Sequence, residues 1–314
     1  MDVLSDLLRR ARARHALIRQ LIQRSPWSMT FADAPPLTIV ATLGGPASVR
    51  LHDSDASPVL LTSGDIALIT KTGRYTIANH PSTPPQVVVQ GGKKHVIEGG
   101  EEGVRAHHSL APRTYGDGLP GATTMLRGAY AFRGDVGDRL LDILPPLAIV
   151  PAGPRTRAAL DMLTTEVAHE EPGQDAVLHQ LLDLVLVLAL RAWCAEPQTA
   201  LPSWYGALAA PAIGDALRHL HEEPAHRWTV AELAAKAGMS RAAFAARFTS
   251  LVGEPPLTYL TGWRMILAAD LLRDREATVA AVAREVGYAD AFAFSVAFKR
   301  ARGTSPSAWR RQPN

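Results

Sequence analysis

One stretch of sequence occurs twice near the C-terminal end of the chain. Thr229-Val230-Ala231 returns as Thr278-Val279-Ala280 at an offset of 49 residues, and after one inserted residue the match continues at an offset of 50. The matched positions are Gly238 with Gly287, Phe244 with Phe294, Phe248 with Phe298, and Tyr259 with Trp309. The chain therefore contains two copies of one supersecondary unit, each too small to be a domain by itself.

Each copy carries the signals of two short helices joined by a tight turn. A threonine stands where its hydroxyl can cap the first helix, and a glycine stands where a left-handed residue can end it. Two phenylalanines four residues apart anchor one side of the second helix. This is the plan of a helix-turn-helix, whose second helix enters the major groove of DNA. The alternative is a helical bundle that uses the same turns for packing, in a purely structural or interaction protein.

Charge separates this region from the rest of the chain. Residues 211–314 hold 14 Lys and Arg against 10 Asp and Glu, whereas residues 1–210 hold 19 against 20. The modest basic excess is therefore C-terminal, and it favours a polyanionic partner for that end of the chain.

The repeated region resembles the DNA-binding domain of the AraC-type (AraC/XylS) transcriptional regulators, in which a long helix joins two helix-turn-helix units. The resemblance covers about residues 211–311 and is carried by the segments WTVAELAAKAGMSRAAFAARF, VGEPPLTYLTGWRMILAADLL and VAREVGYADAFAFSVAFKRARGTSPSAWRR. It implies a sequence-specific transcription regulator rather than an enzyme, with double-stranded DNA and RNA polymerase as partners.

The part of the chain before the repeat is β-rich and then helical. Asp2 to about Arg14 has the spacing of a short amphipathic helix, and His15 to Ala131 consists of short β-branched runs broken by Gly, Pro and Asp. Many short strands of this kind predict a sandwich or a small barrel. Gly91 to Gly121 has few apolar residues and is expected to be a long loop.

The middle of the chain turns helical from Arg155 onward. Val177 to Trp193 is apolar on nearly all sides, so it should be buried against neighbours or between subunits. Pro197 to Pro202 is expected to be an interdomain linker. This order of domains is similar to an AraC-type branch with a cupin-like N-terminal domain, which implies control by a small-molecule effector or by homodimerisation.

The predicted fold is therefore α+β, in three parts. Residues 1–150 form a cupin-like β-barrel or sandwich for sensing or dimerisation, residues 151–202 form a helical middle segment with the linker, and residues 203–314 form an all-α domain with two helix-turn-helix units.

The phenylalanine anchors also predict which residues face DNA. Positions about 120 to 180° away from them on a helix should point outward. In the first copy these are Ala242, Ala246 and Thr249, with Ala245 nearer the boundary, and in the second copy Phe292, Val296 and Lys299, with Ser295 alongside. The cations best placed for phosphates are Arg241, Arg247, Lys299, Arg300, Arg302, Arg310 and Arg311.

These outward faces are unusually apolar. In AraC-type proteins the position of Val296, and often that of Ala246, holds arginine or another polar residue that hydrogen-bonds to bases. Small apolar groups can instead contact the C5-methyl group of thymine. We therefore predict a target site with thymines under Ala242, Ala246, Phe292 and Val296.

A metal-dependent cupin enzyme with a helical appendage is the alternative function. Catalytic cupins carry a His-x-His pair and a later Glu on one strand, but no histidine follows Gly64-Asp65 in Thr70 to Tyr75. No cofactor and no metal site are therefore expected. Weak candidates for metal ligands that could converge across a loop are His80, His95, His107 and His108.

Other features point to a cytoplasmic protein. The chain opens without a signal peptide, and its most apolar run, Leu178 to Leu190, is interrupted by Asp183 and is too short to span a bilayer. Cys194 is the single cysteine, which fits a reducing compartment. That thiol is expected to be structural, with a redox sensor as the alternative. Gly91-Gly92-Lys93-Lys94 lacks the residues of a phosphate-binding loop and is expected to be a mobile basic loop.

Overall fold

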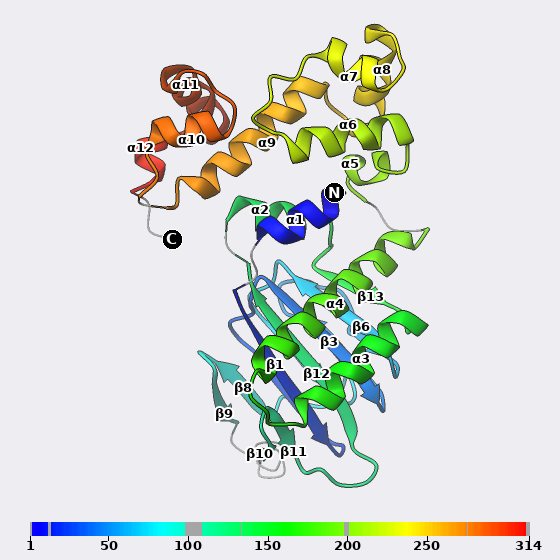
Figure 1. The fold of residues 1–314 in the computed structure, drawn as a ribbon. Helices are drawn as coiled ribbons and strands as arrows, with labels where there is room; N and C mark the ends of the chain where they lie inside the picture. The colour runs from blue at the N-terminus through cyan, green and yellow to red at the C-terminus, as the bar shows by residue number, and fades with distance from the viewer. Residues whose placement is uncertain are drawn as a thin grey trace. The chain divides into compact units, whose positions relative to one another are not determined.

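The computed structural model describes residues 2–11, 14–97, 109–132, 134–197, 201–274 and 276–311, without the side chains of residues 14–16 (Figure 1). It divides into two compact units. The β unit comprises Ala13–Phe132 and Leu144–Thr199, and the helical unit comprises Met1–Arg12, Arg133–Ile143 and Ala200–Asn314. This division differs from the three predicted ranges, because most of the helical middle segment belongs with the sheets and two short N-terminal segments belong with the C-terminal helices.

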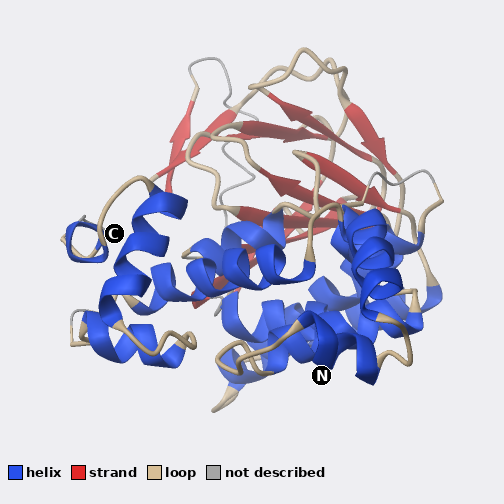
Figure 2. Cartoon of the chain, turned by 90° about the horizontal axis from the view of Figure 1, so that it is seen from above, coloured by secondary structure: helices blue, strands red, loops and turns tan. Residues whose placement is uncertain are grey.

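The strands of the β unit, red in Figure 2, form two sheets. The seven-stranded sheet has the order β10 (Ser109–Ala111), β11 (Thr114–Gly116), β1 (Arg14–Gln23), β12 (Thr123–Ala131), β3 (Leu37–Gly44), β6 (Ile66–Thr70) and β13 (Leu147–Val150). The six-stranded sheet has the order β5 (Val59–Leu61), β4 (Ala47–Leu51), β7 (Tyr75–Ala78), β2 (Ser28–Phe31), β8 (Val87–Gln90) and β9 (Lys93–Val96). Each sheet keeps two end strands, so the predicted cupin-like fold takes the form of an open sandwich and not a closed barrel.

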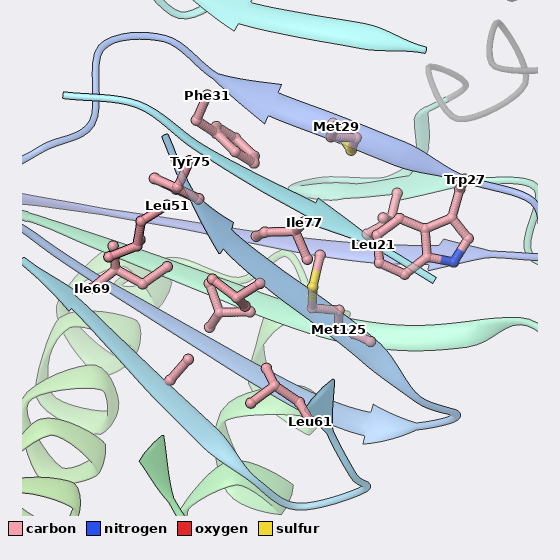
Figure 3. Close-up of a cluster of buried hydrophobic side chains, with 14 of the residues drawn as sticks. Leu21, Trp27, Met29, Phe31, Leu51, Leu61, Ile69, Tyr75, Ile77 and Met125 are labelled. Carbon is pink, nitrogen blue, oxygen red and sulfur yellow. The ribbon is translucent and has the colours of Figure 1, made fainter. Parts of the chain in front are cut away.

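The core of the β unit lies between the two sheets. Trp27, Tyr75 and Ile77 are almost fully buried there, and Figure 3 shows them among the other apolar side chains of the cluster. The first six residues of β3 are all buried, which requires cover on both faces of the seven-stranded sheet. Helices supply the second cover, and their apolar faces explain why β3 is a continuous apolar run and not an alternating one.

Two helices, α3 (Pro154–Val167) and α4 (Gln174–Ala195), lie across the outer face of the seven-stranded sheet (Figure 1). The hydroxyl of Tyr130 donates to the Asp183 carboxylate on α4 over 3.0 Å. A Cβ atom on Gly128 would lie 2.5 Å from a methyl group of Leu182, so this glycine permits the close approach of α4 to β12. A tight helix–sheet contact therefore fixes α4 in place.

Within one chain, α4 is buried on one side only, so the burial predicted for its other side stays a prediction of contact between subunits. Leu182 and Leu186 are buried against the sheet, but Val177 and Leu184 on the opposite side are 45% and 42% exposed. Helix α4 is also longer than the apolar run Leu178 to Leu190 that the sequence analysis considered. In the described part of the chain it is the one helix that is long and apolar enough to cross a membrane, judged by length and composition alone.

The prediction of a long loop from Gly91 to Gly121 is also wrong in part, because three strands lie in that range. Gly91 and Gly92, with φ of 57° and 74°, form the two-residue connection between β8 and β9. Both glycines adopt the left-handed conformation that a tight hairpin requires. The Gly-Gly-Lys-Lys segment is therefore a hairpin turn leading into an edge strand.

The helical unit combines the C-terminal helices with two helices from earlier in the chain. The early helices are α1 (Val3–Ala11) and α2 (Asp135–Leu141). The others are α5 (Ser203–Ala207), α6 (Pro211–Glu222), α7 (Val230–Lys236), α8 (Arg241–Val252), α9 (Pro256–Leu271), α10 (Val279–Glu285), α11 (Ala291–Arg302) and α12 (Pro306–Trp309). Helix α1 packs on α6 and α2, and α2 packs on α9.

Buried polar contacts hold α1 and α2 in the helical unit. The fully buried Asp6 on α1 accepts hydrogen bonds from Arg9 and Arg10 and lies 3.5 Å from Nδ1 of the buried His221 on α6. The carboxylate of Asp270 on α9 accepts from the first two backbone N–H groups of α2, over 2.7 and 3.0 Å. Because a carboxylate stabilises the N-terminus of a helix, Asp270 caps α2 from another element.

The two turn glycines of the repeat offer a matched test of the packing. Gly238 has φ of 63° and open space around its missing Cβ, whereas Gly287 has φ of 86° and a Cβ there would lie 2.5 Å from the Ala225 carbonyl oxygen. We expect G238A to lower the free energy of unfolding by about 1 kcal/mol, the cost of a left-handed alanine. We expect G287A to cost about 1–3 kcal/mol more, because the added methyl group overpacks the contact with Ala225.

The measurement is urea unfolding of the full chain, followed by circular dichroism at 222 nm. The wild-type chain, unfolded under the same conditions, is the reference for both variants. Equal losses of stability in the two variants would show that the close approach at Ala225 contributes nothing.

Candidate nucleic-acid interface

The first copy of the repeat is a helix-turn-helix formed by α7 and α8. The hydroxyl oxygen of Thr229 accepts from the N–H of Glu232 over 3.1 Å, and that of Ser240 accepts from the N–H of Ala243 over 3.2 Å. Both helices therefore begin at side-chain caps that satisfy N–H groups without helical partners. The left-handed Gly253, with φ of 93°, ends α8.

The second copy, formed by α10 and α11, repeats these caps with one chemical change. The hydroxyl oxygen of Thr278 accepts from the N–H of Ala281 over 3.1 Å, but Asp290 takes the place of the serine. Its carboxylate accepts from the N–H groups of Phe292 and Ala293 over 3.1 and 3.0 Å. These two hydrogen bonds lower the pKa of Asp290, so α11 begins at an ionised cap.

The packing of the two second helices is duplicated as closely as their caps. The rings of Phe244 and Phe248 lie 5.8 Å apart at 48°, and those of Phe294 and Phe298 lie 5.7 Å apart at 49°. The second phenylalanine of each pair packs edge to face against a later aromatic ring. The ring centres of Phe248 and Tyr259 lie 6.1 Å apart with an interplanar angle of 73°, and those of Phe298 and Trp309 lie 5.8 Å apart at 79°. All four phenylalanines are fully buried, so the predicted inner sides of both helices are confirmed.

The predicted outer sides of α8 and α11 are accessible. Phe292 is 76% exposed and Val296 is 56% exposed, which is unusual for such large apolar side chains. Ala242 and Ala246 are exposed, while Ala245, Thr249 and Ser295 are half-buried. The Ser295 hydroxyl donates to the Ala291 carbonyl oxygen over 2.7 Å, which leaves its oxygen as an acceptor only.

The predicted cations fall into two groups. Those with exposed side chains are Arg241, Arg247, Lys299, Arg300 and Arg311, and Arg310 is half-buried. Arg302 differs, because its guanidinium pairs with the Asp135 carboxylate on α2 over 2.5 Å and its side chain is only 23% exposed. It also lies over the ring of Trp309, with Arg273 at a similar distance of 5.7 Å. Arg302 therefore ties the end of α11 to α2.

Helix α9 joins the two copies and carries residues that bind to both of them. Tyr259 and Trp263, four residues apart, are both buried on one face of this helix. The Arg264 guanidinium, which no local sequence pattern indicated, donates to the carbonyl oxygens of Pro224 and His226 over 2.7 and 2.8 Å. The indole N–H of Trp309 donates to the Ala269 carbonyl over 3.1 Å. Helix α9 thus contacts segments that flank both copies.

The histidines considered as metal ligands do not form a site among the described residues. Nδ1 of His80 lies 2.7 Å from the Ser82 hydroxyl in a turn, and His95 lies on the exposed edge strand β9. His107 and His108 lie outside the described residues. In the part of the chain that the structure describes, no three His, Cys, Asp or Glu side chains are placed to hold a metal ion together.

Comparisons with known proteins assign both halves of the chain. A cupin family model matches residues 2–195, and a helix-turn-helix domain model matches residues 233–312. An AraC-like transcription regulator of Streptomyces antibioticus is 35% identical over 317 residues, covering 100% of this chain and 99% of that protein. A similar regulator of Streptomyces lividans is 34% identical over 318 residues, with the same coverage.

A match to a solved structure covers the C-terminal helices. The DNA-binding domain of AdpA, determined in complex with a target DNA, is 35% identical and covers 32% of this chain and 89% of that domain, with a TM-score of 0.30.

Two arginines at the end of α11 differ in their partners and should differ in their effect on DNA binding. We expect Arg300→Gln to weaken binding to a selected duplex and to lower the slope of log K against log salt by about 0.9, because one phosphate contact is lost. We expect Arg302→Gln to leave that slope unchanged, since its charge is already neutralised by Asp135.

Fluorescence anisotropy over a range of salt concentrations measures both slopes. Thermal unfolding is the companion measurement, in which Arg302→Gln should destabilise the protein and Arg300→Gln should not. A reduced slope for Arg302→Gln would mean that the pair with Asp135 opens on DNA.

Proposed function

Because the chain belongs to the family of AraC-like transcription regulators, we propose that it places α8 and α11 in successive major grooves on one face of a duplex. The main observation in support of this proposal is that the two helices have the same geometry. Each is capped, each buries the same pair of phenylalanines, and each turns its opposite side to solvent. The family regulates transcription by binding DNA, so this proposal concerns which residues contact the bases.

The bases are read mainly through apolar contacts. Ala242 and Ala246 on α8, and Phe292 and Val296 on α11, occupy the exposed sides where a base edge would lie. These side chains have no hydrogen-bonding group, and the thymine methyl group is the apolar feature of the major groove. Thr249, Ser295 and Ala245 flank these four positions at the edges of the two faces.

Phosphate contacts supply most of the affinity and set the register on the duplex. The side chains proposed for this role are Arg241, Arg247, Lys299, Arg300, Arg310 and Arg311, with Arg302 taking part only where its pair with Asp135 opens. RNA polymerase is the expected second partner at the promoter. The protein acts in the cytoplasm, without catalysing a reaction.

Replacing thymine by uracil in the selected binding site tests the base contacts directly. Uracil lacks only the C5-methyl group, so phosphate contacts and base pairing are retained. We expect the substituted duplex to bind about five- to tenfold more weakly, and the loss to be much smaller for the protein carrying Phe292→Ala and Val296→Ala together. Unchanged affinity for the uracil duplex would refute apolar readout and leave the DNA-binding function intact.

We also propose that the protein forms a homodimer through α4. Val177, Leu181, Leu184 and Leu188 form a strip on the side of α4 away from the sheet, at the alternating four- and three-residue spacing of paired helices. Val177 and Leu184 are 45% and 42% exposed. A second copy of the same strip would bury these side chains, because a self-complementary apolar strip suits a two-fold contact.

Leu184→Glu places a charge at the centre of this strip. We expect it to convert the dimer to a monomer in analytical ultracentrifugation at micromolar concentration. Met162→Glu on α3 is the matched control, because Met162 is 57% exposed and lies outside the strip. A wild-type monomer, or a Leu184→Glu dimer, would exclude this interface.

A further inference from the structure

Two rows of side chains face each other between the sheets of the β unit. In the seven-stranded sheet the register aligns Arg19 on β1, Arg127 on β12, Val40 on β3 and Ala67 on β6. In the six-stranded sheet it aligns Tyr75 on β7, Phe31 on β2, Val89 on β8 and Lys94 on β9. Directly paired residues share a face of the sheet, and Val40, Ala67, Phe31 and Tyr75 belong to the core. Both rows therefore point into the space between the sheets.

One end of this space is cationic where the rest is apolar. Arg19, Arg127 and Lys94, here called the cationic end, stand at the same end of the two rows. Figure 3 shows Phe31 and Tyr75, which neighbour each other in the second row, away from Trp27 and Leu21 in the core. Arginine and lysine are rare in such a layer unless they have a polar partner.

Contacts across the space bring these cations to aromatic rings of the opposite sheet. The Arg127 guanidinium lies 4.3 Å from the ring centre of Phe31, and its Nε donates to the Tyr75 hydroxyl over 2.7 Å. The Lys94 ammonium lies 3.8 Å from the ring centre of Tyr115 on β11. Arg127 and Lys94 thus contact rings of the opposite sheet, and Arg19, whose Nη1 donates to the Ile18 carbonyl oxygen over 2.8 Å, is the cross-strand neighbour of Arg127.

The charges in this region are not balanced by the described part of the chain. None of Arg19, Arg127 and Lys94 forms an ion pair with a described Asp or Glu. Arg19 and Arg127 are direct cross-strand neighbours, an arrangement in which like charges repel. Although Lys94 is exposed as a whole residue, partial desolvation of its ammonium group, and then the nearby charge of Arg19, lower its pKa. An anion placed among the three groups would relieve this repulsion.

The cationic end is accessible to a small molecule. Arg19 and Arg127 are only half-buried, and Lys94 is exposed. Arg19 also lines a cleft of about 410 Å³ that opens toward α4 and contains Glu170 and Asp175, so this cleft is separate from the space that Arg127 and Lys94 face.

We propose that the cationic end binds a small organic anion, whose carboxylate or phosphate group lies among Arg19, Arg127 and Lys94. Guanidinium groups present two parallel N–H donors, which match the oxygens of both groups. The flanking rings of Phe31 and Tyr115 favour a ligand with an apolar body. That this anion acts as the effector rests on the proposed regulatory function, whereas its binding does not.

The binding test uses the full-length protein and two probe anions. Benzoate and inorganic phosphate are titrated by isothermal calorimetry at constant ionic strength, with benzamide as the neutral counterpart of benzoate. We expect saturable binding of at least one anion and none of benzamide. Arg19→Gln and Arg127→Gln should each weaken anion binding about tenfold or more, the usual effect of losing a hydrogen bond to a charged group.

Two further variants test whether the effect depends on the charge and position of Arg127. Arg127→Lys retains the charge and should weaken binding less than Arg127→Gln, while Arg155→Gln removes an exposed arginine of α3 and should have no effect. No saturable binding of either anion would overturn the proposal, as would equal binding by wild type and both arginine variants, which would locate the anion elsewhere. Duplex binding is measured on the same samples. If the wild-type protein binds the duplex but neither anion, this inference is wrong and the proposed function stands. If it binds an anion but no duplex, the proposed function is wrong and this inference stands.

Discussion

The burial of two phenylalanines on one side of each recognition helix determines how the rest of the helical unit can work. A helix has 3.6 residues per turn, so fixing Phe244 and Phe248 inward fixes which residues of α8 face outward. Losing one such buried ring commonly costs about 3–5 kcal/mol, more than any single exposed contact on the opposite side supplies. The same constraint acts on α11, where the ring geometry is nearly identical. The outward faces are therefore set by packing, before any partner is considered.

Helix α9 connects the two copies, and it also contacts α2, a helix of the same unit that comes from an earlier part of the chain. Asp270 on α9 caps α2, the helix that follows β12 and precedes β13. Helix α1 leads directly into β1, and Arg14 of β1 pairs with Ala131 of β12. The connection from α1 into β1 and the connection from β12 into α2 thus lie at the same end of one strand pair. That pair also carries Arg19 and Arg127, so a ligand at the cationic end would act on the two strands that continue into α1 and α2.

Local signals made the duplicated unit predictable from sequence, and non-local contacts explain what was missed. Caps, a turn glycine and phenylalanines four apart all act within one helix-turn-helix, so the pattern alone fixed the inner sides. The pair of Arg302 with Asp135 joins residues far apart in the chain, which no local pattern indicates. The hairpin at Gly91-Gly92 did carry a turn signal, but β9 is exposed along its whole length, and its polar sequence hid the strand. The residues proposed to read DNA stay predictions.

The apolar side chains proposed to contact bases on α8 and α11 explain why these two helices need to act together. A bidentate side chain discriminates a base by about 1–3 kcal/mol, whereas contact with a methyl group is weaker because it involves little area. Because α8 and α11 belong to one folded unit, the free energies by which each helix favours its own bases add, and no further conformational entropy is lost when the second helix binds. Joining two chains through the α4 strip extends this addition to four helices, since the second chain then binds at a high effective concentration. Weak individual contacts can therefore give a selective regulator only if they are linked, which the helical unit does within one chain and the proposed α4 contact would do between two.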